Sequence, residues 1–342
     1  MSPNAKGILI TGGAGYIGSH IVKALVEAKH PNVVVIDNLS TGFADSLPEN
    51  VKLVAGDILD PSLLNHTIEN ENIDTVIHLA AKTVIPESIA HPQVYYENNT
   101  VGTLNLLNAC IKHKVSHFIY SSTAAVYGNT SLEKISEDHP TMPTNPYGHS
   151  KLMSEQILKD IAKQYPLKYT ILRYFNVAGA AIDGSIGQRT PKATHLVKVA
   201  AQTACKEQPT LFIFGDNYPT PDGTCIRDFI HVSDLAQAHL DALSYLQKGG
   251  ESCILNCGYG HGFSVKEVVK AIEQITKQPL PISIAKAREG DLPCVIADNN
   301  KIKQRLHWKP QFDDISLIVK TALQWEEKLL NTFHDNLDKS KH

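Results

Sequence analysis

The chain has 342 residues, of which 42% are hydrophobic and 20% are charged, a composition typical of an ordinary globular protein. Its formal net charge of −3 supplies no global field for a polyanion or an anionic membrane, so neither nucleic acid nor a membrane is an expected partner. No run of about 18 apolar residues predicts a membrane span, and MSPNAKGILI lacks the features of a signal peptide. Six cysteines without a CxxC pair favour reduced thiols, so we expect a cytoplasmic protein without a metal site.

Short apolar runs alternate with longer segments of helical periodicity in the first half of the chain. The expected strands are GILIT at 7–11, NVVVID at 32–37, VKLVAGD at 51–57, TVIHLA at 75–80, HFIYSS at 117–122 and YTILRYF at 169–175. Because both faces of such runs must be covered, they predict an α/β fold with a Rossmann-type, doubly wound parallel sheet. The rhythm loosens after residue 178. We therefore expect a Rossmann domain over 1–178 and a smaller α/β substrate lobe over 179–342, from which some segments return to the sheet.

The segment TGGAGYIGSH at 11–20 places Gly12, Gly15 and Gly18 three residues apart between a strand and a helix. One glycine allows the tight turn, the next lets backbone amides approach a pyrophosphate, and the last permits close packing. Asp37 ends the next strand, where a carboxylate accepts from the ribose hydroxyls of NAD, whereas an arginine would favour NADP. These residues predict NAD as the cofactor. Asp57 ends the third strand, where contact with the adenine amine and a plain turn role fit equally well.

A second chemical signal is YGHSK at 147–151, which places Tyr147 and Lys151 on one face of a helix. A free phenol has a pKa of about 10, too high for a base at neutral pH, and a nearby ammonium favours the phenolate. Thr123 follows the strand HFIYSS at the ligand-binding edge of the sheet, where its hydroxyl can relay a proton between the substrate and Tyr147. Alone, this spacing also fits an exposed helix start. With the glycine turn in the same domain, the set predicts a catalytic site.

The glycine turn, SSTAAVYG at 121–128 and YGHSK together resemble the extended short-chain dehydrogenase/reductase family. Within it, FGDNYPTPDGTCIRDFIHVSDLA at 214–236 is similar to the corresponding stretch of the UDP-galactose 4-epimerases. Further similar segments are YYENNTVGTLNLL, LRYFNVAGA, NCGYGHGFSV and REGDLP. The resemblance covers nearly the whole chain. It implies reversible epimerisation at carbon 4 of a UDP-hexose through a 4-keto intermediate, tightly bound NAD, and a homodimer.

The resemblance also implies roles for individual residues. The implied NAD contacts are Gly12, Gly15, Tyr16, Ile17, Gly18, Asp37, Asn38, Asp57, Ile58, Leu79, Ala80, Ala81, Asn98, Ser121, Tyr147, Lys151 and Tyr174. The implied substrate contacts are Thr123 and Val295 at the hexose, Asn176 and Asp291 at the nucleotide sugar, His195 and Leu196 along the nucleotide pocket, Phe214 against uracil, and Arg227 and Arg288 on the diphosphate. On local sequence alone, ordinary structural roles fit the substrate set about as well.

Some positions depart from the family pattern. Several epimerases carry a lysine that reaches the nicotinamide ribose, and a gapless alignment places Thr83 there, with Lys82 one residue earlier. Ala125 replaces a hydroxyl residue that often contacts the hexose. Val295 stands where relatives have either tyrosine or a small residue. Both changes predict a roomier hexose pocket, which would also accept UDP-GlcNAc and UDP-GalNAc.

Several alternatives stay open at this point. Within the family they are a UDP-glucuronate epimerase, a decarboxylase and a nucleotide-sugar dehydratase, although Ala124 and Ala125 replace the acidic pair expected of a dehydratase. A plain dehydrogenase and a catalytically silent NAD-sensing protein are the others. The segments 92–113 and 146–164 resemble the helices that pair in epimerase dimers. Leu104, Leu107, Cys110 and Ile111 have suitable spacing, which also fits ordinary core packing.

Overall fold

The computed structural model describes residues 6–130, 134–190, 194–288 and 290–339, with side chains described as far as residue 332. The chain divides into two compact units. The first contains residues 1–174, 235–257 and 298–309, and the second contains 175–234, 258–297 and 310–342. The chain thus first leaves the first unit at residue 174, close to the boundary of 178 expected from the sequence, and returns to it twice.

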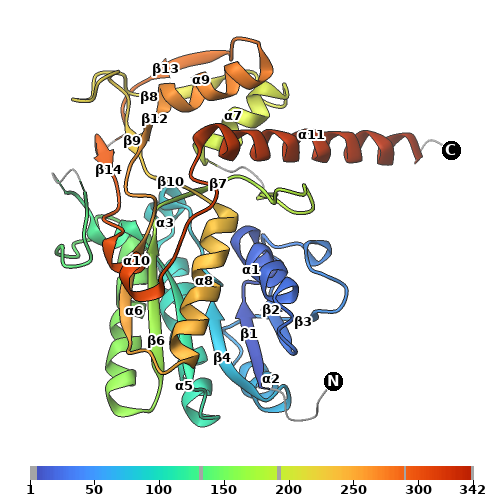
Figure 1. The fold of residues 1–342 in the computed structure, drawn as a ribbon, viewed down its shortest axis with the longest axis vertical. Coiled ribbons are helices and arrows are strands. Elements are labelled where there is room, and N and C mark those ends of the chain that lie inside the picture. The colour runs from blue at the N-terminus through green and yellow to red at the C-terminus, as the bar shows by residue number, and fades with distance from the viewer. Residues whose placement is uncertain (1–5, 131–133, 191–193, 289, 340–342) are drawn as a thin grey trace. The chain divides into compact units, whose positions relative to one another are not determined.

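A seven-stranded parallel sheet forms the centre of the first unit, in the order β11-β6-β5-β4-β1-β2-β3 (Figure 1). Its strands are β1 (Gly7–Thr11), β2 (Val33–Asp37), β3 (Lys52–Ala55), β4 (Ile73–His78), β5 (His117–Thr123), β6 (Lys168–Tyr174) and β11 (Cys253–Cys257). The order confirms the doubly wound fold. Strand order reverses between β1 and β4, and such switch points bind ligands at the carboxyl ends of the strands.

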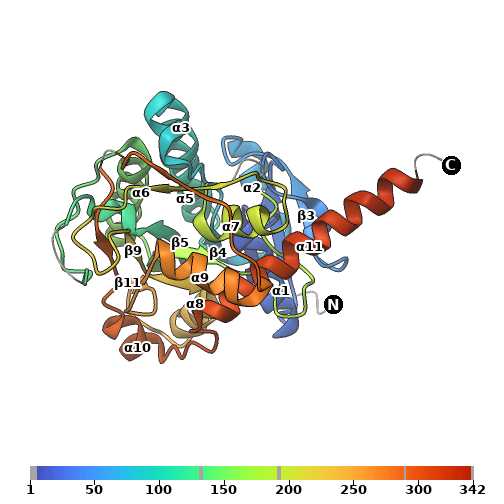
Figure 2. The ribbon, with the colours of Figure 1, turned by 90° about the horizontal axis from the view of Figure 1, so that it is seen from above.

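Helices cover both faces of this sheet (Figures 1 and 2). On one face, Leu64 of α2, Leu107 of α5 and Leu158 of α6 share a buried core with the strands. On the other face lie α1 and α8. The helices are α1 (Tyr16–Glu27), the 3-10 helix η1 (Ala44–Ser46), α2 (Pro61–Asn70), α3 (Ile85–Ala90), α4 (Pro92–Tyr95), the π-helix η2 (Tyr96–Val101), α5 (Gly102–Lys112), the 3-10 helix η3 (Ala124–Tyr127), α6 (Pro146–Gln164), α8 (Val232–Gln247) and α10 (Asn300–Leu306).

The described residues of the second unit form three small sheets and three helices. The sheets pair β7 (Asn176–Ala178) with β10 (Phe229–His231), β8 (Leu211–Phe214) with β13 (Ile282–Ala285), and β9 (Ile226–Arg227) with both β12 (Phe263–Ser264) and β14 (Cys294–Val295). The helices α7 (Leu196–Ala204), α9 (Val265–Thr276) and α11 (Ile315–Lys339) contact one another. Within the described ranges, no helix of either unit is long and apolar enough to cross a membrane.

Candidate active site

The turn between β1 and α1 leaves open space at its middle glycine. Gly12 has a φ of +74°, which side chains rarely adopt, and a Cβ there would lie 2.7 Å from the Ala80 nitrogen. A Cβ on Gly18 would lie 2.2 Å from the Gly12 carbonyl oxygen, so α1 packs directly on the turn. Gly15 is the N-cap of α1, where no side chain caps the helix, and a Cβ there would meet only the Gly12 oxygen, at 3.3 Å. An open, uncapped helix start of this kind fits a dinucleotide pyrophosphate.

Asp37 ends β2 and holds the glycine turn in place. Its Oδ2 accepts a hydrogen bond from the Ala14 amide at 2.9 Å, and its Oδ1 accepts one from the Leu39 amide at 2.8 Å. Each carboxylate oxygen retains a second lone pair that can accept from a ribose hydroxyl. The carboxylate is therefore both a brace for the turn and a suitable ribose acceptor.

Asp57 does not end a strand, because β3 stops at Ala55. It lies in the following turn, where its Oδ2 accepts from the Asn38 side chain at 2.8 Å and its Oδ1 from the Leu59 amide at 2.9 Å. Ile58, the next residue, is buried. The Asn38–Asp57 hydrogen bond thus joins two of the residues implied as NAD contacts and ties the segments that follow β2 and β3 to each other.

The segment after β4 is fixed by an asparagine that the sequence analysis missed. Leu79, Ala80 and Ala81 follow the strand and are half-buried. The Asn99 side chain then accepts from the Lys82 amide at 2.8 Å and donates to the Lys82 carbonyl at 3.0 Å. Asn99 and its neighbour Asn98 belong to the π-helix η2, and π-helical turns often occur at functional sites. The only signal in the sequence is the Asn-Asn pair in YYENNT.

The predicted catalytic side chains meet at the carboxyl end of β5. Thr123 is the last residue of β5, and α6 starts with Pro146, so Tyr147 lies in its first turn. The Thr123 hydroxyl accepts from the Ala125 amide at 3.1 Å, and it also interacts with the Tyr147 phenol and lowers the pKa of that phenol. The Lys151 ammonium lies over the Tyr120 ring, 4.4 Å from its centroid. All three predicted catalytic residues are buried.

Burial dominates the electrostatics of this set. It raises the pKa of Tyr147, and the hydrogen bond from Thr123 opposes the rise. It also lowers the pKa of Lys151 to about 7, an effect that the Glu155 carboxylate opposes. Glu155 lies one helical turn beyond Lys151 and forms a buried ion pair with Arg173 of β6, at 2.6 Å. The sequence predicted a lysine beside the phenol but did not indicate that this lysine titrates near neutral pH.

A buried histidine from α8 also reaches the end of the sheet. His239 donates from Nδ1 to the Leu235 carbonyl at 2.9 Å, so its Nε2 accepts from the Ser121 hydroxyl at 3.1 Å. Its ring lies 6.4 Å from that of Tyr174. Ser121 and Tyr174 were predicted from the sequence as NAD contacts. His239 was missed, since nothing in the helical pattern of its segment indicates which face meets the sheet.

Two arginines of the second unit lie beside other predicted substrate residues. Arg227 lies 3.8 Å from the Asp291 carboxylate, and its Nη1 donates to the Leu292 carbonyl at 2.8 Å. Arg288 stacks on the Phe214 ring, 3.8 Å from the centroid. Val295 pairs in register with Arg227 across β14 and β9. In this set Phe214, Arg227, Asp291 and Val295 are half-buried and Arg288 is exposed, so the second unit carries two guanidinium groups near one carboxylate.

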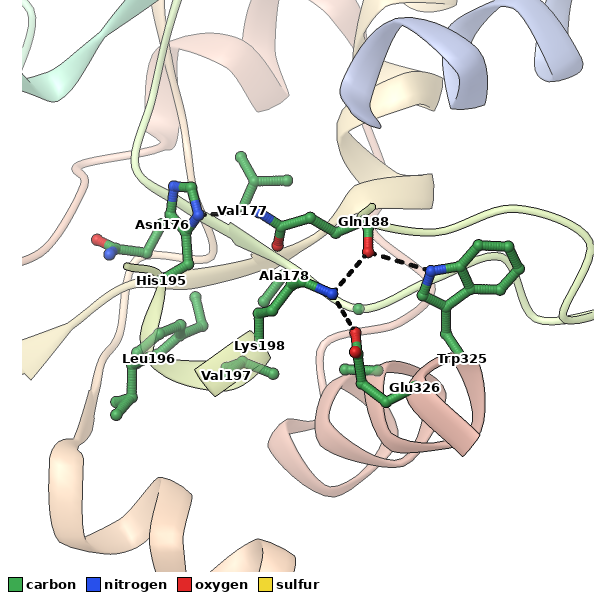
Figure 3. Close-up of a pocket in the computed structure, with 13 residues that line it drawn as sticks. Asn176, Val177, Ala178, Gln188, His195, Leu196, Val197, Lys198, Trp325 and Glu326 are labelled. Carbon is green, nitrogen blue, oxygen red and sulfur yellow. Dashed lines mark hydrogen bonds and ion pairs between the residues drawn. The ribbon is translucent and has the colours of Figure 1, made fainter. Parts of the chain in front are cut away.

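Three further predicted substrate residues, Asn176, His195 and Leu196, line one pocket of the second unit (Figure 3). The same pocket is also lined by Gln188, Lys198, Trp325 and Glu326, none of which the sequence analysis singled out. These four side chains are buried, whereas Asn176 and His195 are exposed at the pocket mouth. The predicted cofactor and catalytic residues thus lie in the first unit, and the predicted substrate residues other than Thr123 lie in the second.

Comparison with known proteins places the chain in a family. Residues 8–258 match the NAD dependent epimerase/dehydratase family. A UDP-glucose 4-epimerase of Azospirillum brasilense is 50% identical over 322 residues, which cover 94% of this chain and 92% of that protein. The chain therefore belongs to the NAD dependent epimerase/dehydratase family.

Solved structures agree with this assignment. The crystal structure of UDP-glucose 4-epimerase from Brucella ovis in complex with NAD matches with a TM-score of 0.91 and 41% identity, covering 93% of this chain and 98% of that one. The UDP-Glc/GlcNAc 4-epimerase from Campylobacter jejuni matches with a TM-score of 0.83 and 47% identity, covering 94% and 99%.

Proposed function

We propose that the protein is an NAD-dependent epimerase that interconverts UDP-glucose and UDP-galactose at carbon 4. The observation that carries this proposal is the buried Thr123, Tyr147 and Lys151 set at the end of β5, in a chain whose relatives along nearly its full length are UDP-glucose 4-epimerases. The β1–α1 turn, with open space at Gly15 and the Asp37 carboxylate beside it, suits NAD.

In the proposed reaction, Tyr147 removes the proton from the 4-hydroxyl of the hexose. The β1–α1 turn and Asp37 would hold NAD, which would supply a reversible hydride acceptor for carbon 4. Thr123 lowers the pKa of Tyr147, which favours the phenolate, and Lys151 lies one helical turn away to support the negative charge. In the second half of the reaction, Tyr147 gives its proton back to the sugar oxygen. The overall reaction is redox-neutral.

The test uses purified protein without added cofactor. UDP-glucose, UDP-GlcNAc and UDP-glucuronate are incubated with it separately, and the anomeric proton signals are followed by NMR. We expect UDP-glucose to convert to an equilibrium mixture with UDP-galactose, with no net change in reduced-nicotinamide absorbance. Conversion of UDP-glucuronate alone would favour the uronate alternative. Protein that carries NAD and converts none of the three would be a non-catalytic NAD-binding relative.

A second activity, on UDP-GlcNAc and UDP-GalNAc, is supported by the small side chains at Val295 and Ala125. Both residues are half-buried. A tyrosine in place of Val295 would fill tens of Å³ of the space that an acetamido group needs. We expect Val295→Tyr to abolish turnover of UDP-GlcNAc and to preserve that of UDP-glucose, with kcat and KM measured for both. Equal losses on the two substrates would contradict a size-selective role for residue 295.

We further propose that the protein is a cytoplasmic homodimer. The six cysteines all lie in described segments and none forms a disulfide, which suits a reducing compartment. Apolar side chains are exposed on mutually contacting helices of the first unit, as an interface between copies would require. They are Val84, Ile85 and Ile89 at α3, Val101 of η2, Leu104 of α5 and Met153 of α6.

A further inference from the structure

A buried ion pair lines the pocket that contains Asn176, His195 and Leu196, and its lysine binds one backbone carbonyl. Lys198 of α7 and Glu326 of α11 pair at 2.5 Å, and each side chain is only 4% exposed. Lys198 also donates to the Gln188 carbonyl at 3.0 Å, and the Trp325 indole donates to the same oxygen at 3.1 Å (Figure 3). Donors from two helices thus fix the backbone at Gln188.

The Gln188 side chain in turn meets His195 at the pocket mouth. Its Nε2 lies 2.9 Å from the imidazole Nδ1. An amide nitrogen only donates, so Nδ1 must accept and the imidazole proton must lie on Nε2. A proton on Nδ1 would set two donors against each other. Partial burial of the ring and the Lys198 ammonium both lower the pKa of His195, which also favours the neutral ring.

The second imidazole nitrogen is turned away from Gln188, toward the side of the pocket where the Asn176 side chain lies (Figure 3). We propose that Gln188 is a positioning residue that keeps His195 neutral with its proton on Nε2, as a hydrogen-bond donor to the UDP moiety of the substrate. This inference rests on the proposed function. In this arrangement the neutral His195 orients the UDP moiety through a hydrogen bond. Arg227 and Arg288 then bind the negative charge of the diphosphate.

If Gln188 keeps His195 neutral, the pH dependence of UDP-sugar binding should differ between variants of Gln188, which a purely structural role would not predict. Binding of a UDP-sugar should change little between pH 6 and pH 8, because the hydrogen bond from Gln188 keeps His195 in its neutral form. Gln188→Glu replaces the donor by a carboxylate, which accepts from Nδ1–H and raises the pKa of His195. The imidazolium then attracts the diphosphate at low pH. Gln188→Leu removes the partner without adding charge.

The experiment measures UDP-glucose binding by calorimetry at pH 6, 7 and 8, in a Tyr147→Phe background that prevents turnover. UDP-glucose is used because it lacks the terminal phosphate of UDP, which would itself titrate near pH 6. We expect Kd to change less than about threefold across this range with Gln188 present. Gln188→Glu should bind about tenfold more tightly at pH 6 than at pH 8. Gln188→Leu should weaken binding roughly fivefold at every pH, as expected for one neutral hydrogen bond.

Nitrogen-15 NMR of the imidazole rings reads the tautomer directly, with His195→Phe identifying the His195 signals. The expected spectrum shows a neutral ring protonated on Nε2, changing to an imidazolium in Gln188→Glu at pH 6. In the His195→Phe background, Gln188→Glu should no longer make binding depend on pH. The matched control is Gln208→Glu, an exposed glutamine, which should leave all profiles unchanged.

A ring protonated on Nδ1 with Gln188 present, or parallel pH profiles for Gln188 and Gln188→Glu, would overturn the positioning role. Absence of UDP-glucose binding would overturn it as well. If the tautomer and the binding profiles are as expected while the unmodified protein epimerises no UDP-sugar, the proposed function fails and the role of Gln188 stands.

Discussion

At the scale of single residues, the chemistry depends on the buried phenol of Tyr147. Its ring lies 6.5 Å from the Tyr95 ring, and Thr123 opposes the rise in its pKa that burial causes. Tyr147→Phe removes the phenol oxygen and keeps the packing. We expect kcat to fall at least about 100-fold, since general acid–base groups contribute that much. Bound NAD and the free energy of unfolding should stay near their original values. NMR measures the turnover, and release of NAD on denaturation measures the bound cofactor. Retained turnover would remove Tyr147 from the mechanism.

A second residue, His239, should make the protein sensitive to acid. Burial lowers its pKa to about 4, although the Leu235 carbonyl opposes the shift, whereas an exposed histidine titrates near about 6.5. Between these values the unfolded chain binds a proton that the native state does not, so stability is fully present above pH 6.5 and is lost as pH falls. Between pH 7 and pH 5, we expect the free energy of unfolding of the wild type to fall by about 2 kcal/mol more than that of His239→Gln. Urea unfolding at both pH values measures this, and equal losses would contradict it.

The residues that the sequence revealed differ in kind from those that it did not. Tyr147 and Lys151 are four residues apart on one helix, so local geometry alone places them together. His239 contacts Ser121 across 118 residues of sequence, and Asn99 contacts Ser150 across 51. Such pairs are set by how helices pack on the sheet, and a histidine or asparagine on a helix carries no local sign of the partner it will meet.

At the scale of elements, the β1–α1 turn separates two kinds of glycine. A Cβ at Gly15 has a single neighbour, at 3.3 Å, so Gly15→Ala should fold, at a cost below about 1 kcal/mol, and lose most bound NAD by blocking the pyrophosphate. A Cβ at Gly18 would collide with the Gly12 carbonyl, so Gly18→Ala should lose about 1–3 kcal/mol of stability. Urea unfolding and NAD content measured on both variants test this. Full NAD content in Gly15→Ala would contradict a phosphate at that position.

Helix α6 is tied to strand β6 by the buried pair of Glu155 and Arg173. Glu155 accepts from Arg173 at 2.9 and 2.6 Å and from the Ser122 hydroxyl at 2.5 Å. Glu155→Gln leaves the guanidinium buried without a counter-charge, so we expect a loss of about 3–5 kcal/mol in unfolding free energy. Asp160→Asn, an exposed acid on the same helix, is the matched control and should change stability little. Equal effects of the two would contradict a special role for the buried pair.

Strand β11 is the strand of the main sheet that the sequence did not predict. The six expected strands lie within two residues of the observed ones, because each is a run of apolar residues whose faces are both covered. β11 is the short segment CILNC, and it adds to the sheet beside β6 after a long excursion of the chain. Its Asn256 accepts from the Tyr127 hydroxyl at 2.6 Å, a contact of tertiary origin. The sequence predicted only that some later segments return to the sheet.

At the scale of the whole molecule, the remaining question is how two copies would meet. Of the four side chains expected at a helical interface, Leu107 and Cys110 are fully buried in the core of the first unit, whereas Leu104 is 38% exposed. Met153 of the contacting helix α6 is 47% exposed. The spacing in the sequence therefore mixed core and surface positions, and the apolar surface lies on α3, η2, α5 and α6 together.

If this surface is the dimer interface, a charge placed on it should separate the copies. Light scattering after gel filtration should give twice the 37.5 kDa chain mass for the wild type and a single chain mass for Leu104→Asp combined with Met153→Asp. Ile284→Asp is the matched control, because Ile284 is 50% exposed on β13 of the second unit. It should leave the mass unchanged. A wild type of single chain mass would exclude the dimer, and dissociation by Ile284→Asp alone would move the interface to the exposed face of β8 and β13.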